Sequence, residues 1–248
     1  MAGQTRSYVL YVPDDVSGPT PLLLGFHGFT SNPQNFVERT GFADLAASEG
    51  FLLALPVGTF GAWDALRGSG DVDFARAVVA DVALHATVDL SRVYAIGFSN
   101  GGAMAARLGC DAADLVASVG VVSGANYGAA QCDPGRAVAV VAFHGTDDLI
   151  VPFGGLGSIL PGAVEWAAGW AENNGCDPEP ASARAADDVE VRTWFECDEN
   201  VAVKLNVIEG GGHGWPHPDP PDQILNSTTS ISATDLIWEF VSGYSLAG

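Results

Sequence analysis

Basic residues are scarce in this chain. Lys204 is its only lysine, and lysine and arginine together number 10 against 30 aspartates and glutamates, which gives a formal charge of -20. A surface of this charge repels phosphate backbones and anionic lipid headgroups. We therefore expect neither nucleic acid nor membranes as partners, and we interpret the charge as a solvated acidic surface that aids solubility.

Long apolar runs are also missing. Although 48% of the residues are hydrophobic, no apolar stretch reaches the length of a membrane span. The opening Met-Ala-Gly-Gln-Thr-Arg lacks the apolar core of a signal peptide, so we expect the N-terminus of a mature chain behind a start methionine. No repeat, linker or low-complexity tract divides the sequence. At this length we expect one domain, residues 1–248, with a single large core.

Metal-binding patterns are absent as well. No pair of histidines or cysteines has the spacing of a zinc site, and we expect neither a metal nor another cofactor. The four cysteines occur as Cys110 with Cys132 and Cys176 with Cys197, and three pairings are possible in principle. Sequential pairing would close two short loops, each worth about 3 kcal/mol by the chain-entropy model, and would persist in an oxidising compartment. We expect this pairing and hence secretion; four buried thiols in a cytosolic enzyme are the alternative.

Apolar segments alternate between strand-like and helix-like patterns. Continuous or alternating apolar runs predict strands at 6–12, 21–26, 51–55, 93–96, 117–122, 137–143, 189–197 and 201–208. Apolar spacing and terminal glycines predict helices at 36–48, 71–87, 103–108, 164–173 and 234–244. Because most strands are apolar throughout and alternate with helices, we expect an α/β protein with a mostly parallel sheet and helices on both faces.

The segment Gly97-Phe-Ser99-Asn-Gly101 has the pattern of a nucleophile elbow. In this turn a serine is presented on a sharp bend between a strand and a helix, and the two glycines lack side chains so that backbones can pass closely. The pattern alone is weak in a glycine-rich chain, but an apolar strand precedes it and good helix formers follow it. We interpret Ser99 as a nucleophile; a serine in an ordinary βα turn is the alternative.

A serine nucleophile needs an imidazole base and a carboxylate that orients it. Five histidines compete for the role of the base. His213 follows three glycines in the loop after the last strand, and it completes the order Ser, Asp, His of α/β-hydrolases. We therefore choose His213, with a surface loop histidine as the alternative reading. The others are His85 in a helix, His217 among prolines, and His27 and His144, which close apolar strands and fit a role in loop geometry.

Four motifs together resemble a known family. They are Phe26-His-Gly-Phe-Thr, Gly97-Phe-Ser-Asn-Gly-Gly, His144-Gly-Thr-Asp-Asp-Leu-Ile-Val-Pro and Gly211-Gly-His-Gly-Trp-Pro. They are similar to motifs of the secreted esterase family that holds polyhydroxybutyrate depolymerases, feruloyl esterases and acetylxylan esterases, and the match covers nearly the whole chain. The resemblance implies an α/β-hydrolase fold and a secreted serine carboxylic-ester hydrolase without a cofactor.

The resemblance also implies roles for single residues. The catalytic triad would be Ser99, Asp148 and His213. The oxyanion hole would consist of the backbone N–H groups of Phe29 and Asn100. Both cysteine pairs also fall where such enzymes often carry disulfides.

Two adjacent carboxylates, Asp147 and Asp148, compete for the role of the triad acid. Successive residues that leave a strand tend to point in opposite directions, so only one of them can face His213. The family spacing favours Asp148, with Val151 and the proline after it fixing the far side of the loop. We expect Asp147 to face solvent or to cap the loop.

Loop lengths and aromatic residues suggest a substrate class. The loops 122–137 and 151–164 are short, so we expect no lid domain and an open cleft. Trp63 and Trp215, with Phe29, are expected to form a flat apolar platform that binds substrate, although packing in the core or in loops is the alternative for both tryptophans. We expect a monomer that acts on an ester linked to a polysaccharide or to a polyester such as a polyhydroxyalkanoate or an aromatic polyester.

Other classes remain open. A small-ester carboxylesterase or a lipase-like enzyme would share the catalytic residues, and a non-catalytic carbohydrate-binding relative would share the fold. The sequence contains no appended substrate-binding module, which argues against attack on a crystalline polymer.

Overall fold

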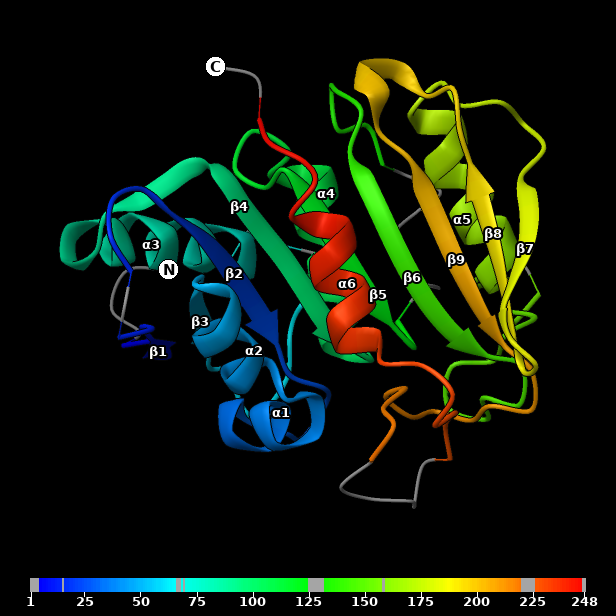
Figure 1. Ribbon diagram of the computed structural model, residues 1–248, viewed down its shortest axis with the longest axis horizontal. Helices are drawn as coiled ribbons and strands as arrows, with labels where there is room; N and C mark the ends of the chain where they lie inside the picture. Colours follow the sequence, from blue (N-terminus) through cyan, green and yellow to red (C-terminus); the bar gives the residue numbers. More distant parts are fainter. Residues whose placement is uncertain are drawn as a thin grey trace.

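A twisted sheet forms the centre of the protein. The computed structural model describes residues 5–14, 16–65, 68, 70–124, 132–157, 159–219 and 226–246. In this part of the chain the sheet has nine strands in the order β1-β3-β2-β4-β5-β6-β9-β8-β7 (Figure 1). They are β1 (Tyr8–Tyr11), β2 (Thr20–Phe26), β3 (Leu52–Pro56), β4 (Val88–Phe98), β5 (Ser118–Val122), β6 (Ala139–Gly145), β7 (Ala181–Ala186), β8 (Val189–Trp194) and β9 (Val203–Ile208).

Parallel pairing dominates the sheet. The neighbours from β3 through β2, β4, β5 and β6 to β9 all pair parallel, whereas β1, β8 and β7 add antiparallel edges. The strands β3, β5 and β6 are buried along their whole length, as expected for parallel strands covered on both faces. The sequence prediction of a mostly parallel sheet is confirmed.

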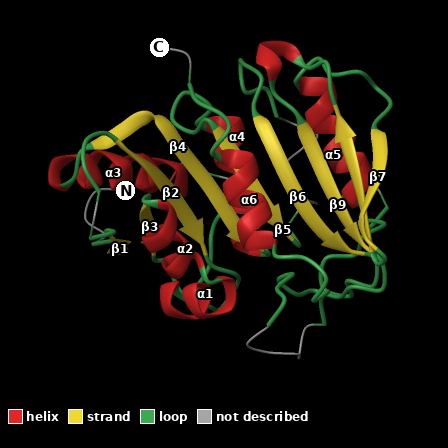
Figure 2. Cartoon of the chain, in the orientation of Figure 1, coloured by secondary structure: helices red, strands yellow, loops and turns green. Residues whose placement is uncertain are grey.

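Helices cover both faces of the sheet, and the hydrophobic core is correspondingly divided in two. Alternation along β2 shows the division, because Leu22 and Leu24 point into one core cluster and Leu23 into the other. Figure 2 shows α6 on the near face and α5 on the far face. The helices are α1 (Pro33–Thr40), α2 (Phe42–Glu49), α3 (Gly70–His85), α4 (Asn100–Asp111), α5 (Ala163–Asn173) and α6 (Ala233–Val241).

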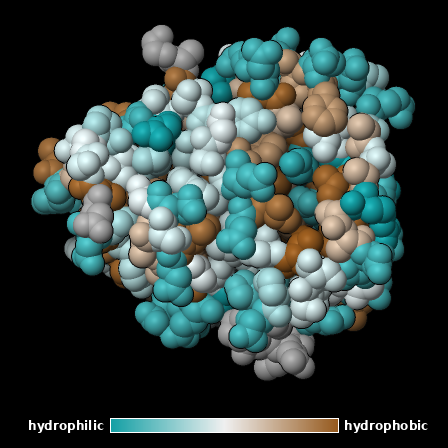
Figure 3. All heavy atoms as spheres, viewed as in Figure 1, coloured by the Kyte–Doolittle hydropathy of each residue, from teal (hydrophilic) through white to brown (hydrophobic). Residues whose placement is uncertain are grey.

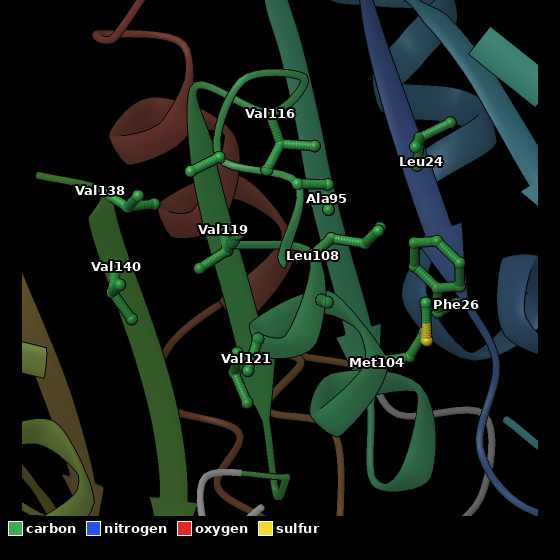
Figure 4. Packing of buried hydrophobic residues seen from close by; sticks show 14 of the residues in the cluster. Leu24, Phe26, Ala95, Met104, Leu108, Val116, Val119, Val121, Val138 and Val140 are labelled. Carbon is green, nitrogen blue, oxygen red and sulfur yellow. The ribbon is translucent and has the colours of Figure 1, made fainter. Parts of the chain in front are cut away.

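Helix α4 is the helix that continues from the candidate elbow, and it is deeply packed. Met104 and Leu108 on its inner side are fully buried. Figure 4 shows Met104 beside the ring of Phe26, and both helix residues belong to the same core cluster as Val121 of β5. Because α4 begins at Asn100, this packing fixes the turn that carries Ser99 relative to the sheet.

Two elements differ from the sequence prediction. The single helix expected at 36–48 is two helices, because Gly41 adopts a left-handed φ of 70° and ends α1 before α2 begins. Strand β7 was not expected at all. Its sequence, Ala-Ser-Ala-Arg-Ala-Ala, has little β-propensity, and it forms a largely exposed edge strand held by antiparallel pairing with β8.

Both predicted disulfides are present, Cys110 with Cys132 and Cys176 with Cys197. The expectation of no lid in the loop 122–137 falls partly on residues 125–131, which lie outside the described residues. Over the described ranges, no helix is both long and apolar enough to cross a bilayer. Hydrophilic residues are spread over the face seen in Figure 3, with apolar residues showing between them.

Candidate active site

The candidate site lies at the carboxyl ends of four parallel strands, whose arrowheads reach the same edge of the sheet in Figure 1. Phe29 follows β2, Ser99 follows β4, Asp148 follows β6 and His213 follows β9. Loops at this edge are the usual place for ligands and catalytic groups in open α/β sheets. The parallel topology therefore brings together residues that are far apart in the sequence.

Ser99 occupies a strained turn between β4 and α4. Its backbone has φ 55° and ψ -120°, a conformation that side-chain-bearing residues rarely adopt. A Cβ atom on Gly97 would lie 2.1 Å from the carbonyl oxygen of Gly101, and one on Gly101 would lie 2.0 Å from the carbonyl oxygen of Phe26. Neither glycine can be replaced without a backbone shift, so the prediction that both must lack side chains is confirmed.

A chain of hydrogen bonds links Ser99, His213 and Asp148. His213 Nε2 lies 2.9 Å from Ser99 Oγ, and His213 Nδ1 lies 2.7 Å from Asp148 Oδ2. Because a carboxylate only accepts hydrogen bonds, Nδ1 carries the proton and Nε2 is left to accept the O–H of the serine. This is the tautomer that a general base needs.

Asp148 is held by several donors and is fully shielded from solvent. Its Oδ1 accepts the backbone N–H groups of Ile150 at 2.9 Å and Val151 at 2.8 Å. Burial by itself raises the pKa of this carboxyl, but the hydrogen bonds from His213, Val151 and Ile150 and the nearby imidazole outweigh it, so its pKa is lowered. Asp148 is therefore ionised, whereas its neighbour Asp147 is exposed, and in the described part of the chain no hydrogen bond joins it to His213.

The two residues expected to supply the oxyanion hole lie close to Ser99, since Asn100 follows it in the chain and Phe29 lines the same cavity. Asn100 is the first residue of α4, where N–H groups lack intrahelical acceptors, and Phe29 lies in the loop after β2. Over the described residues, neither N–H donates a hydrogen bond within the protein. The Asn100 side chain is engaged elsewhere: its Oδ1 accepts the Trp63 N–H at 2.8 Å, and its Nδ2 donates to the Trp63 carbonyl at 3.1 Å.

A cavity of about 250 Å³ opens on Ser99 and His213. Most of its wall is apolar, with polar groups contributed by α1 and the loop before it. It is lined by Gly28, Phe29, Ser31, Asn35, Phe36, Arg39, Phe98, Ser99, Ile150 and His213. A larger cavity of about 920 Å³ lies beside β1 and α3, but none of the three hydrogen-bonded residues lines it. The smaller cavity is therefore the one that fits the chemistry.

No family model matches the chain. Among known proteins, feruloyl esterase C of Emericella nidulans is 32% identical over 248 residues, covering 95% of this chain and 83% of that protein. The chain belongs to this esterase family. Feruloyl esterase B of Piromyces equi is 29% identical over 234 residues. The match covers 84% of the present chain but only 42% of the length of that relative.

The α/β-hydrolase fold of this family member is shown by structural similarity. Acetyl xylan esterase from Aspergillus awamori superimposes with a TM-score of 0.69 and 16% identity, covering 95% of this chain and 93% of that chain. The resemblance to feruloyl and acetylxylan esterases is thus confirmed. The expected resemblance to polyhydroxybutyrate depolymerases stays a prediction.

Trp63 and Trp215 do not form an exposed platform in this esterase family member. Each is only 4% exposed. The indole Nε1 of Trp63 donates to the carbonyl of His27 at 2.9 Å, and that of Trp215 donates to Thr234 Oγ1 at 3.0 Å. An indole can be buried once its N–H finds an acceptor, so the packing alternative holds and the platform prediction is wrong. Of the three expected aromatics only Phe29, at 64% exposure, reaches the surface.

The histidines that end β2 and β6 lie closer to the site than sequence reasoning indicated. His144 is fully buried, and its Nε2 donates to the carbonyl of Val151 at 2.8 Å and lies 3.4 Å from Asp148 Oδ2. Burial lowers the pKa of both His144 and His27. The signal that could have found them is their position: each follows or ends a parallel strand at the edge where the other site residues gather.

Proposed function

We propose that the protein is a secreted serine carboxylic-ester hydrolase that acts through an acyl-enzyme. The observation that carries the proposal is the hydrogen-bonded chain of Ser99, His213 and Asp148 at a strained elbow that opens on a cavity. In this mechanism Ser99 Oγ attacks the ester carbonyl while His213 Nε2 takes its proton. His213 then protonates the leaving alcohol, Asp148 holds the imidazole, and water later releases the acid by the reverse proton transfers.

The proposal assigns the oxyanion to two backbone donors. As the carbonyl carbon becomes tetrahedral, negative charge develops on its oxygen, and the N–H groups of Phe29 and Asn100 would bind it. Donors that are already oriented need no reorganisation during the reaction, which is why such groups lower the barrier. Their position beside Ser99 and their lack of acceptors within the described protein support this role.

We propose esters linked to a polysaccharide, of the feruloyl or acetyl type, as the substrate class. The names of the relatives support this class. The open rim of the cavity, where Phe29 and Ile150 are 64% and 61% exposed, suits an ester on a chain too large to enter. A polyester is the second candidate, favoured by the exposed apolar side chains of Phe29 and Ile150 at the same rim.

The two disulfides support secretion, because such bonds persist in oxidising compartments. We further propose that the chain acts as a monomer with one catalytic domain over residues 1–248.

Replacing Ser99 with alanine tests the mechanism. Ser99→Ala should lower hydrolysis of a soluble ester by several orders of magnitude, because the nucleophile is lost. Its thermal transition should stay near that of the wild type. Ser48→Ala, on the exposed surface of α2, is the matched control and should keep full activity. Turnover by Ser99→Ala within about tenfold of the wild type would contradict the proposal.

A substrate panel tests the proposed class. Methyl ferulate, acetylated xylan, amorphous polyhydroxybutyrate and an aromatic polyester should be compared at equal enzyme concentration. Hydrolysis of either of the first two supports the polysaccharide-ester class, and hydrolysis of only the last two supports the second candidate. Activity confined to long-chain p-nitrophenyl esters would contradict both and indicate a lipase-like enzyme.

A further inference from the structure

We propose that His27 is a positioning residue that fixes the direction of the Phe29 N–H, the first of the two oxyanion donors. The inference rests on the proposed function and extends it to a residue that does not line the cavity. His27 directly follows β2 and is 1% exposed, so its ring has no access to substrate. Any effect of His27 on the reaction must therefore pass through the backbone groups that its ring contacts.

Both ring nitrogens of His27 contact backbone groups. The Gly58 N–H donates to Nε2 at 3.0 Å, and Nδ1 lies 2.9 Å from the carbonyl oxygen of Gly28. Because Gly58 N–H can only donate, Nε2 must be the unprotonated nitrogen, and Nδ1 carries the hydrogen that it donates to Gly28. Burial lowers the pKa of His27, which keeps this neutral tautomer in place.

The carbonyl of Gly28 and the N–H of Phe29 belong to one peptide group. The described chain contains no cis peptide bond, and in a planar trans peptide the C=O and N–H bonds point in opposite directions. Holding the Gly28 oxygen toward His27 therefore turns the Phe29 N–H away from His27, toward the cavity that Gly28, Phe29 and Ser99 line together. The N–H of Ser31 also donates to the Gly28 oxygen, at 3.2 Å, and adds to this restraint.

This peptide lies in close contact with the residue that precedes Ser99. A Cβ atom on Gly28 would lie 3.2 Å from Cδ1 of that residue, Phe98. The peptide thus packs directly against the elbow, and a small rotation of it would displace the Phe29 N–H from the oxyanion. Because such donors act only where charge develops, misdirection should reduce the rate of reaction and leave binding of the neutral ester nearly unchanged.

The segment 57–64 braces His27 and connects it to the second donor. Besides the Gly58 contact, Gly61 accepts the Thr30 N–H at 2.7 Å, and the Trp63 indole donates to the His27 carbonyl at 2.9 Å. The same segment is held by the side chain of Asn100, whose backbone N–H is the second oxyanion donor. Both donors are therefore connected to one segment of the chain.

Three substitutions separate the two ring contacts. In His27→Asn the side-chain amide can replace Nδ1–H as donor to Gly28 but does not reach Gly58. In His27→Gln the longer side chain can offer an acceptor to Gly58 near the place of Nε2 but loses the donor to Gly28. His27→Phe keeps an aromatic ring against Trp63, from which the imidazole centroid lies 5.0 Å, and loses both contacts.

We expect kcat on a soluble ester to fall about 10²-fold in His27→Phe and His27→Gln, with KM changed less than about threefold, and to return to within about tenfold of the wild type in His27→Asn. Binding of a boronic acid that forms a tetrahedral adduct on Ser99 should weaken in parallel with kcat. Thermal unfolding of each variant serves as the control for folding. If His27→Phe does not fold, the comparison of Asn with Gln decides alone.

Equal kcat in the Asn and Gln variants, or a higher kcat in Gln, would overturn the inference and leave His27 with a structural role only. Wild-type kcat in folded His27→Phe would do the same. Failure of the proposed function has a different signature, because Ser99→Ala would then keep its activity and the boronic acid would not bind the wild-type protein.

Discussion

At the scale of single residues, the adjacent carboxylates show why position after a strand matters. Asp148 and Asp147 have the same chemistry, but Asp148 is buried and bonds His213, whereas Asp147 is exposed and accepts a hydrogen bond only from Thr146 in the described structure. The spacing within the motif from His144 to Val151 indicated this choice. The burial of Trp63 and Trp215 could not be predicted from a local motif. It depends on hydrogen-bond acceptors for their indole N–H groups, such as Thr234, that are distant in the sequence.

The pair Asp148→Asn and Asp147→Asn tests this assignment. Asp148→Asn should lower kcat on a soluble ester at neutral pH by about 10³ to 10⁴, since an amide can hold the imidazole in the wrong tautomer. Asp147→Asn is the matched control and should change kcat less than about threefold. A dead Asp147→Asn beside a near-normal Asp148→Asn would show that the acid is assigned one residue too far along the chain.

At the scale of elements, strong local signals predicted the core of the fold. The strand, elbow and helix around Ser99 were expected because an apolar run, two glycines and good helix formers follow one another. The break between α1 and α2 was missed, although Gly41 marks it, because the apolar positions continue across the glycine. Strand β7 could not have been found, since its strand state comes from pairing with β8 rather than from its own residues.

Gly101→Ala tests the close passage of the elbow. The new methyl group would lie 2.0 Å from the Phe26 carbonyl oxygen and 2.5 Å from that of His27, so the elbow or the end of β2 must move. We expect a large loss of unfolding free energy, well above that of an average substitution, which is about 1 kcal/mol, together with loss of activity. Gly154→Ala is the control, because no atom lies within 4 Å of its added Cβ. Urea unfolding of both variants measures the difference, and equal stability would contradict the packing described.

At the scale of the whole molecule, the parallel sheet brings the site residues together at one edge and buries His27 and His144 near them. His144 has no hydrogen-bond partner at Nδ1 within the described structure, and burial lowers its pKa. A group whose folded pKa lies below its unfolded value, about 6.5 for histidine, contributes stability that is complete above that pH. This contribution is lost as the pH falls through the folded pKa, because the unfolded chain then binds more protons.

The lowered pKa of His144 predicts that the protein becomes less stable as the pH falls. The unfolding free energy of the wild type should fall from pH 7 to pH 5 more steeply than that of His144→Gln, in which the amide can still donate to the Val151 carbonyl but cannot be protonated. His85→Gln, at the exposed end of α3, controls for removal of a surface imidazole. Urea unfolding at both pH values gives the slopes. A slope in His144→Gln as steep as in the wild type would show that His144 does not contribute.

The central claim is that Ser99 is a nucleophile activated by His213, and covalent trapping with a fluorophosphonate tests it most directly. In that reaction Ser99 Oγ forms a bond to phosphorus, fluoride leaves, and the serine proton passes to His213. Intact mass and peptide mapping should show one adduct per chain, on the peptide that contains Ser99, with loss of esterase activity in proportion to labelling. Ser99→Ala should not be labelled, and His213→Ala should be labelled far more slowly. An adduct on another residue that abolishes activity, or full inactivation with Ser99 unmodified, would contradict the account.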